Sequence, residues 1–338
     1  MRCLLVAVAT ALGLTPCAAR ALSQPPARLS QTGLYASQGQ VDPGHLAFAP
    51  QYPLWTDGAA KSRWIHLPAG EAIQGRDEDS WALPVGTKVW KEFRFQGRKV
   101  ETRLLWKTGP QAWVFASYLW NEAQTDATLV PETGLADLEV APGLRHSIPS
   151  RTDCRSCHGQ ASVELLGFNA LQLSTDRDPG ALHAEPLGPG MVTLKELVAR
   201  GLLRGARPDL LSRPPRILAD GPATRTALGY LAANCASCHR GDRPLPGLDL
   251  DFRHTSRVTA AADEPGLRTT LRRPSTYLIP GEPASLRLDP ADPGRSTLLH
   301  RMASRRPASQ MPPLGSSLAD QEALAHLRRW VANLAPSH

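Results

Sequence analysis

Long apolar segments are missing from this sequence. Beyond residue 21, no stretch of 18 consecutive apolar residues occurs, which excludes a protein that spans a membrane several times. Strong charge of one sign is also missing: the net charge is only +7 over 338 residues and gives no argument for a nucleic-acid partner. Hydrophobic residues make up 42% and charged residues 20%, which excludes a disordered chain and fits two or three folded domains. Proline is plentiful, with 31 residues, and predicts much irregular backbone.

The first 21 residues have the pattern of a secretory signal peptide. Arg2 gives a short positive start, residues 4–14 are apolar, and a small-residue cleavage signal ends at Ala21. A retained membrane anchor is the alternative, but the apolar run is too short for it and Pro16 interrupts it. The sequence therefore predicts an exported, periplasmic protein that is cleaved near Ala21 and has no transmembrane segment in its mature chain.

Cysteine is scarce, and its placement is the strongest functional signal. Two of the six cysteines leave with the signal peptide, and the other four lie in two copies of Cys-x-x-Cys-His. This is the pattern by which c-type haem is attached: two thiols add to the vinyl groups of one haem, and the adjacent histidine ligates its iron. The residues concerned are Cys154, Cys157 and His158 in the first copy, and Cys235, Cys238 and His239 in the second.

Three other uses of two Cys-x-x-Cys pairs are weaker. A structural zinc site gives no reason for a histidine directly after both pairs. A thioredoxin-like redox motif needs a βαβ context and would not occur twice in this form. Two disulfides closed within such short spacings would be strained. The sequence therefore predicts two covalently attached haem c groups, with iron, as the cofactors.

The last 118 residues, 221–338, resemble a class I cytochrome c domain. Residues 224–235 form a predicted helix that runs into the second motif, and residues 318–334 form a predicted C-terminal helix. In that family the two helices cross near a glycine, with an aromatic residue packed beside it, and Gly229 and Trp330 fit these positions.

The predicted distal ligand of the second haem is Met311, one of three methionines beyond residue 21. It begins a Met-Pro-Pro loop just before the last helix, and a thioether is a soft ligand that suits haem iron. Met302 lies in a predicted helix and is expected in the core, while His300 is a competing ligand.

The first haem segment, residues 146–220, is not a complete cytochrome domain. Pro149 and a polar run argue against a helix that enters the first motif. Met191 is the leading candidate for the distal ligand, His183 and His146 are alternatives, and an open sixth position is a further possibility.

An aromatic-rich β domain is predicted over residues 48–145, after a linker over 22–47. Thirteen of the 19 aromatic residues lie between positions 48 and 120. Four segments have strand patterns, at 61–67, 89–95, 99–106 and 112–120. The predicted fold class is thus β plus α, with an N-terminal antiparallel β-sandwich or small barrel followed by a mostly helical dihaem cytochrome c region. The aromatic residues are expected to form a core rather than a ligand pocket.

The order of these features resembles a Shewanella-type family of uncharacterised, exported dihaem c-type cytochromes. The resemblance covers residues 30–338 and is carried by five segments: PLWTDG at 53–58, LPVGT at 83–87, ETRL at 101–104, WNEAQTDA at 120–127 and PSRTDCRSCH at 149–158. It implies two haems and electron transfer, and it supplies no defined reaction.

The predicted function is that of a periplasmic dihaem c-type cytochrome that transfers single electrons between redox partner proteins. A dihaem enzyme of peroxidase or oxidase type, with an open first haem, is one alternative. A redox-sensing or structural module is the other. Because no acid–base constellation is recognisable, no catalytic residue is predicted, an electron carrier is favoured over an enzyme, and any small-molecule substrate stays open.

Overall fold

The structure is a computed structural model that describes residues 24–37, 39–158, 165–242, 245 and 247–334. The predicted signal peptide, residues 1–21, lies outside the described residues. Within the described ranges, no helix combines the length and the apolar character needed to cross a membrane.

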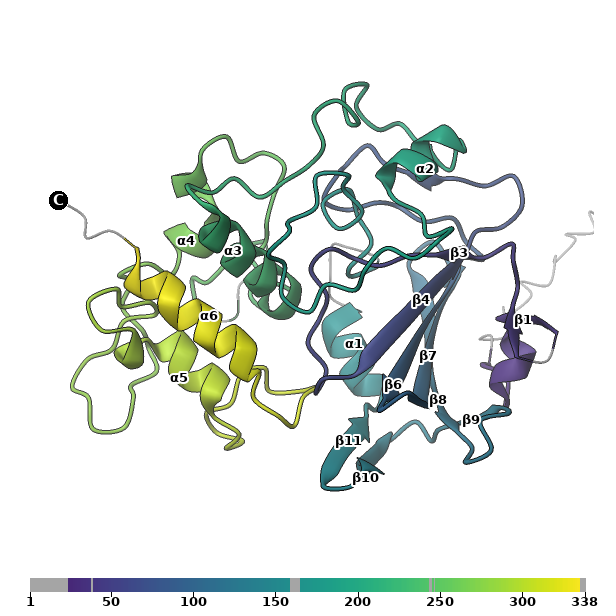
Figure 1. The fold of residues 1–338 in the computed structure, drawn as a ribbon, viewed down its shortest axis with the longest axis horizontal. Helices are drawn as coiled ribbons and strands as arrows, with labels where there is room; N and C mark the ends of the chain where they lie inside the picture. The colour runs from purple at the N-terminus through teal and green to yellow at the C-terminus, as the bar shows by residue number, and fades with distance from the viewer. Residues whose placement is uncertain (1–23, 38, 159–164, 243–244, 246, 335–338) are drawn as a thin grey trace, which may run out of the picture.

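A six-stranded antiparallel sheet forms one half of the molecule (Figure 1). Its strand order is β3-β4-β6-β7-β8-β9, and all neighbours pair antiparallel. This confirms the four predicted strands, because β4, β6, β7 and β8 cover those segments. The strands are β3 (Leu46–Ala47), β4 (Ala60–His66), β6 (Lys88–Phe95), β7 (Arg98–Gly109), β8 (Ala112–Trp120) and β9 (Ala127–Leu129).

The first face of this sheet packs on the N-terminal segment of the described chain. That segment contains η1 (Leu29–Thr32), β1 (Tyr35–Ser37) and β2 (Gln40–Val41). Its leucines bury the tryptophan side chains of the sheet, and the indole N–H of Trp90 donates to Thr32 Oγ1 at 3.0 Å. Most aromatic residues of the predicted β domain are thus core residues. Alternation along the strands places their side chains on the buried faces of the sheet.

The opposite face, called the inner face below, looks toward the rest of the chain. Val89, Leu105 and Phe115 on this face join a core cluster with Phe168 and Leu197. Smaller elements surround it: β5 (Ile73–Gln74) pairs in parallel with β12 (Leu203–Arg204), and β10 (Leu135–Ala141) forms a hairpin with β11 (Leu144–Ile148). The helices α1 (Arg151–His158) and α2 (Leu194–Ala199) complete this half.

The other half contains the remaining helices around a second core. They are α3 (Pro222–Cys235), α4 (Pro265–Arg268), α5 (Thr297–Ala303) and α6 (Gln321–Ala332), with the 3-10 turns η2 (Ala261–Asp263) and η3 (Pro293–Arg295). The apolar faces of α3 and α6 meet in this core, and the indole N–H of Trp330 donates to Thr224 Oγ1 at 3.2 Å. Both predicted terminal helices of this half are therefore present.

The predicted fold class was wrong in two respects. The C-terminal region is not mostly helical, because α4 and α5 have only 4 and 7 residues and long irregular segments separate the helices. Prolines break the chain between α4 and α5, at Pro274, Pro280, Pro283, Pro290 and Pro293. The described β structure is an open sheet with several two-stranded sheets beside it, and β3 and β9 are its short edges, so it closes neither a sandwich nor a barrel.

The two halves are joined by residues 50–58, which we call the bridging segment. Its Trp55 backbone N–H donates to Asn234 Oδ1 of α3 at 2.7 Å. The Asp57 carboxylate accepts the backbone N–H groups of Ser317 and Leu318, each at 2.9 Å, ahead of α6. These contacts fix both long helices of the second half to the sheet.

At Gly229, the bridging segment packs closely against α3. A Cβ atom at this position would lie 2.1 Å from Cε1 of Tyr52, whose ring is buried. Tyr52 is held in turn by its hydroxyl, which donates to Asp178 Oδ2 at 3.2 Å. The expected partner of Gly229 was the last helix, whereas the structure places a ring of the bridging segment against it.

We predict that Gly229→Ala destabilises the protein by about 1–2 kcal/mol. Overpacking a filled core costs roughly 1–3 kcal/mol, and the better helix propensity of alanine offsets up to about 1 kcal/mol of that. Chemical denaturation measures the free energy of unfolding. In a Tyr52→Ala background, Gly229→Ala should instead raise the free energy of unfolding. The overpacking is then gone, and only the better helix propensity of alanine remains. A stabilising effect of Gly229→Ala in the wild-type background would show that this contact is absent.

Candidate functional site

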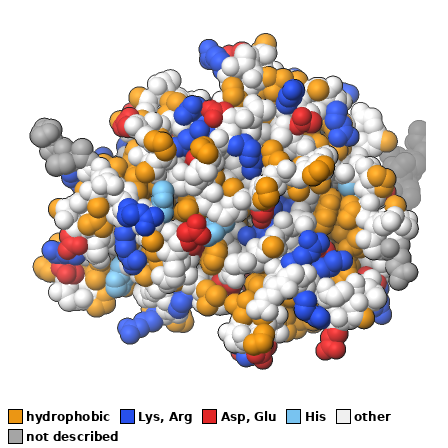
Figure 2. Space-filling model, in the orientation of Figure 1, with side chains coloured by type: hydrophobic (Ala, Val, Ile, Leu, Met, Phe, Trp, Pro, Cys, Tyr) orange, Lys and Arg blue, Asp and Glu red, His pale blue; other side chains and the backbone are white. Residues whose placement is uncertain are grey.

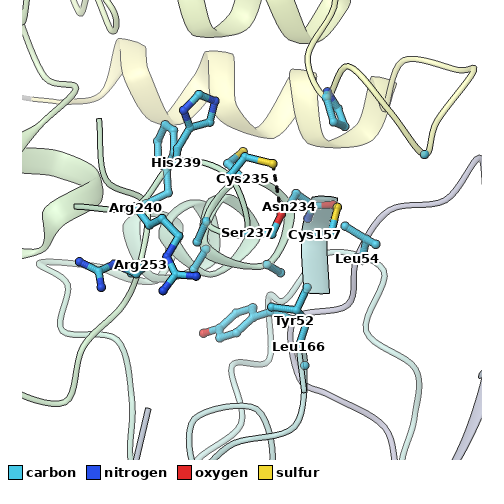
Figure 3. A pocket seen from close by; sticks show the side chains of 18 of the residues that line it. Tyr52, Leu54, Cys157, Leu166, Asn234, Cys235, Ser237, His239, Arg240 and Arg253 are labelled. Atoms are coloured by element: carbon cyan, nitrogen blue, oxygen red, sulfur yellow. Dashed lines mark hydrogen bonds between the residues drawn. The ribbon is translucent and has the colours of Figure 1, made fainter. Parts of the chain in front are cut away.

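One large cavity lies between the inner face of the sheet and the second half of the molecule. Its volume is about 860 Å³, and both Cys-x-x-Cys-His motifs line it. Figure 3 shows Cys157 of the first motif near Cys235 and His239 of the second, with Tyr52 of the bridging segment at the same cavity. The structure therefore brings together two motifs that lie about 80 residues apart in the sequence.

The first motif forms most of a short helix, α1, which begins directly after Ser150. Asp153 caps it: its Oδ2 accepts the backbone N–H of Ser150 at 2.9 Å and the Ser150 hydroxyl at 2.7 Å. The strand β11 ends at Ile148 and α1 begins at Arg151, so three helical residues precede Cys154. The prediction that no helix enters the motif was therefore wrong, although this helix is much shorter than the one before the second motif. α1 packs against the inner face, and the ring centroids of His158 and Phe115 lie 5.7 Å apart.

The second motif follows the C-terminal end of α3. Cys235 is the last residue of α3, and its carbonyl accepts the backbone N–H groups of Cys238 at 3.2 Å and His239 at 2.9 Å. The ring of His239 meets that of Phe252 edge-on, with centroids 5.9 Å apart. The chain thus turns sharply after α3 and presents its two thiols and its imidazole to the cavity.

The thiols of the two motifs contact each other. The Cys157 thiol donates a hydrogen bond to the Cys238 sulfur, which lowers the pKa of Cys238 and raises that of Cys157. Burial raises the pKa of Cys154, and it raises the pKa of Cys235 to about 12. Cys238 is therefore the most nucleophilic thiol of the four, because the thiolate is the reactive form.

Both motif histidines are half-buried, and the buried Nδ1 atom of each has no hydrogen-bond partner among the described residues. Burial, with smaller effects of Lys91 and Arg103, lowers the pKa of His158 to about 4. Burial and two arginines also lower the pKa of His239. Both imidazoles are thus neutral at pH 7.

The structure brings only one of the two predicted sulfur ligands, Met311 and Met191, to the cavity. Met311 lines the cavity, and so does Met302, which is also a buried core residue. Met191 does not line the cavity, and its sulfur accepts the backbone N–H of Gly188 at 3.3 Å. Met191 is therefore not brought to the first motif.

The alternative histidines are engaged elsewhere. His183 Nε2 lies 2.8 Å from Asp320 Oδ2, ahead of α6. His146 of β11 is buried with Nε2 3.0 Å from Glu101 Oε2. His300, the competitor of Met311, does not line the cavity either. The contacts of His183 and His146 tie these two histidines to the fold, and none of the three histidines lines the cavity.

The cofactor prediction, two covalently attached haem c groups with iron, is corrected by the structure. Within the described ranges, no group of three or more His, Cys, Asp and Glu side chains is arranged to hold a metal ion. Carboxylates of the cavity wall are held by arginines instead, as Asp251 is by Arg253 at 2.8 Å. The prediction of two haem c groups is therefore wrong. They build a cavity surrounded by four thiols and two neutral imidazoles.

The contribution of the sheet to this cavity was not predicted from the sequence. Arg63, Lys91 and Arg103 line it from three neighbouring strands. A signal was available in the sequence, because these residues alternate with the core tryptophans and leucines along strands that were predicted. Their convergence depends on strand register, which the sequence pattern left open.

Comparisons with known proteins add no assignment: no protein-family model, no curated protein and no solved structure matches the chain.

An ion-pair network ties the inner face to the hairpin that precedes α1. Glu101 is fully buried and accepts from Arg103 Nε at 2.6 Å and from Arg103 Nη2 at 2.9 Å. His146 Nε2 lies 3.0 Å from Oε2, the oxygen that also accepts from Nη2. Burial by itself would raise the pKa of Glu101, but Arg103 and His146 lower it to about 2. The network thereby holds β11, and with it the start of α1, against β7.

We predict that Glu101 makes folding stability sensitive to acid. Its pKa in the folded state lies near 2, below its ordinary value of 4.5, so its stabilisation is present above pH 4.5 and is lost as pH falls toward 2. A shift of this size corresponds to roughly 3 kcal/mol. Urea denaturation between pH 5 and 2.5 should show a shallower pH dependence for Glu101→Gln than for wild type. The exposed control Glu122→Gln should keep the wild-type slope, and equal slopes for all three proteins would contradict this role.

Proposed function

We propose that the protein is an exported electron-transfer protein that passes single electrons between redox partner proteins. The observation that carries this proposal is the convergence of four thiols on one cavity. Two thiols come from α1 and two from the end of α3, and together they are all the cysteines beyond residue 21. Every cysteine of the predicted mature chain is thus committed to this site.

The role of the thiols depends on whether electrons pass one at a time or in pairs. A dithiol/disulfide couple exchanges two electrons, so thiols alone do not suit single-electron transfer. The proposal therefore assigns them to holding a redox-active group covalently. Cys238 suits this role best, because its lowered pKa favours the thiolate that forms covalent bonds.

The walls of the cavity support such a role. Phe115 and Phe252 flank the two motif histidines, and Tyr52, Leu54 and other apolar residues line the space between the halves. Apolar walls limit the access of water to a reactive group and so protect it from side reactions.

The surface supports contact with protein partners. Figure 2 shows Lys and Arg side chains over both halves of the visible face, with Asp and Glu between them. Such mixed charge suits transient encounters that are steered electrostatically.

We expect the exported, purified protein to weigh more than its polypeptide when its mass is measured under denaturing conditions. The double variant Cys154→Ala/Cys157→Ala should lose one part of this excess mass, and Cys235→Ala/Cys238→Ala should lose the other part. The variant with all four substitutions should have the mass of the bare polypeptide. Each loss should reduce the number of electrons that the protein accepts from a one-electron donor in stopped-flow mixing.

Ser156→Ala is the matched control, because this exposed residue lies between the two cysteines of the first motif. It should keep both the excess mass and the electron uptake. A wild-type mass equal to that of the bare chain would overturn the proposal. Turnover of peroxide or oxygen that outpaces electron exchange would favour an enzyme instead.

A further inference from the structure

A histidine outside both motifs, His254, also lines the cavity. It belongs to the segment between the second motif and α4, and its side chain is 7% exposed. Its Nδ1 atom lies 3.0 Å from Oε1 of Glu264, a buried residue directly before α4. The same carboxylate oxygen accepts the backbone N–H of Leu218 at 3.2 Å. The imidazole and the carboxylate thus form a fixed pair at the cavity wall.

The carboxylate decides which nitrogen of His254 is free. A carboxylate only accepts hydrogen bonds, so Nδ1 carries the hydrogen atom and the neutral ring keeps its lone pair on Nε2. The Nε2 atom has no hydrogen-bond partner among the described residues, and it is not fully buried. Because this residue lines the cavity, Nε2 is available there as a proton acceptor.

His254 differs in its surroundings from the two motif histidines. His158 and His239 have no hydrogen-bond partner at Nδ1 among the described residues, and burial and neighbouring cations oppose their protonation. His254 instead contacts a buried carboxylate, which balances the charge of an imidazolium. Of the described histidines that line the cavity, His254 is therefore the one whose contacts favour a bound proton.

Other charged groups near the pair do not cancel the effect of Glu264. Arg253 precedes the histidine in the chain and is held by Asp251 at 2.8 Å. Asp79, from the first half, accepts from the Thr255 hydroxyl at 3.0 Å and brings a further carboxylate to this wall. The remaining charged residues on the segments next to the pair are Arg216, Asp220, Arg257, Asp263 and Arg268. Within the described ranges, Glu264 alone is in hydrogen-bond contact with the imidazole.

Electron uptake in the cavity creates a need for a positive charge. One electron added to a group there adds one negative charge, which apolar walls stabilise poorly. Opposite charges interact strongly at short range in such surroundings, and a cavity of about 860 Å³ keeps its occupant close to His254. A proton bound at His254 would offset the added charge.

We propose that His254 takes up a proton from solvent when the group in the cavity accepts an electron, and releases it when the electron leaves. This inference rests on the proposed function, since a redox partner protein supplies the electron. An N–H bond forms at Nε2, no bond of the group breaks, and the imidazolium is paired with Glu264. Reduction and protonation then favour each other by the same factor. A tenfold tighter binding of the proton in the reduced state corresponds to a potential that falls by about 59 mV as the pH rises.

Protein-film voltammetry of the purified protein between pH 4 and 9 tests this coupling. The potential of the one-electron wave should fall with rising pH by about 59 mV or more. His254→Gln should abolish the fall, because the amide cannot take up this proton. Glu264→Gln should move the fall to lower pH, because the imidazolium loses its counter-charge. His326→Gln is the matched control and should behave as wild type, since this histidine of α6 does not line the cavity.

NMR titration of the His254 ring in oxidised and reduced wild-type protein is a second readout that needs no variant to fold. The ring should bind its proton at least tenfold more tightly in the reduced protein. Equal affinities in the two states would refute the inference, and so would a one-electron wave that ignores pH or a fall that persists in His254→Gln. These results leave the proposed function standing. The absence of any one-electron wave refutes the proposed function, and this inference with it.

Discussion

The position of the bridging segment, residues 50–58, is the constraint on which the rest of the structure depends. Its ring at Tyr52 fills the space that Gly229 leaves open in α3, and its carboxylate at Asp57 anchors the chain ahead of α6. The cavity exists because these contacts hold α3 at a fixed distance from the inner face of the sheet. Without them, the thiols after α3 would have no defined place relative to those of α1.

The chemistry of the site follows from this arrangement. Burial keeps the motif imidazoles neutral and raises the pKa of two thiols, while the contact between Cys157 and Cys238 makes one sulfur more acidic. The sheet adds a cationic wall, whose arginines are neutralised by Glu101 and Glu185. The cavity thus carries thiols on one side and the basic side chains of the sheet on the other.

The sequence predicted local features well. Alternation along residues 89–95 and 99–106 predicted β6 and β7, and the apolar stripe of residues 318–334 predicted α6, because such patterns record which side of an element is buried. The capping box of Thr193 and Glu196 at the start of α2 is another feature that depends only on residues close in the sequence. The two Cys-x-x-Cys-His motifs were visible as candidate site residues.

Long-range features were beyond the sequence. The separation of Met191 from the first motif depends on how a proline- and glycine-rich segment folds back, and no local pattern encodes that path. The engagement of His146 by Glu101 depends on the hairpin of β10 and β11 docking on β7. The proportion of helix was overestimated because the resemblance at the two ends of residues 221–338 was extended across the irregular segments between them.

Protein-film voltammetry of the purified protein tests the central claim most directly, since it counts the electrons moved at the site in each step. A single-electron carrier should give reversible waves with the width of a one-electron process, and these should disappear in the variant that lacks all four cavity cysteines. A two-electron wave whose potential follows the pH as a dithiol couple does would contradict the account, and so would the absence of any reversible wave.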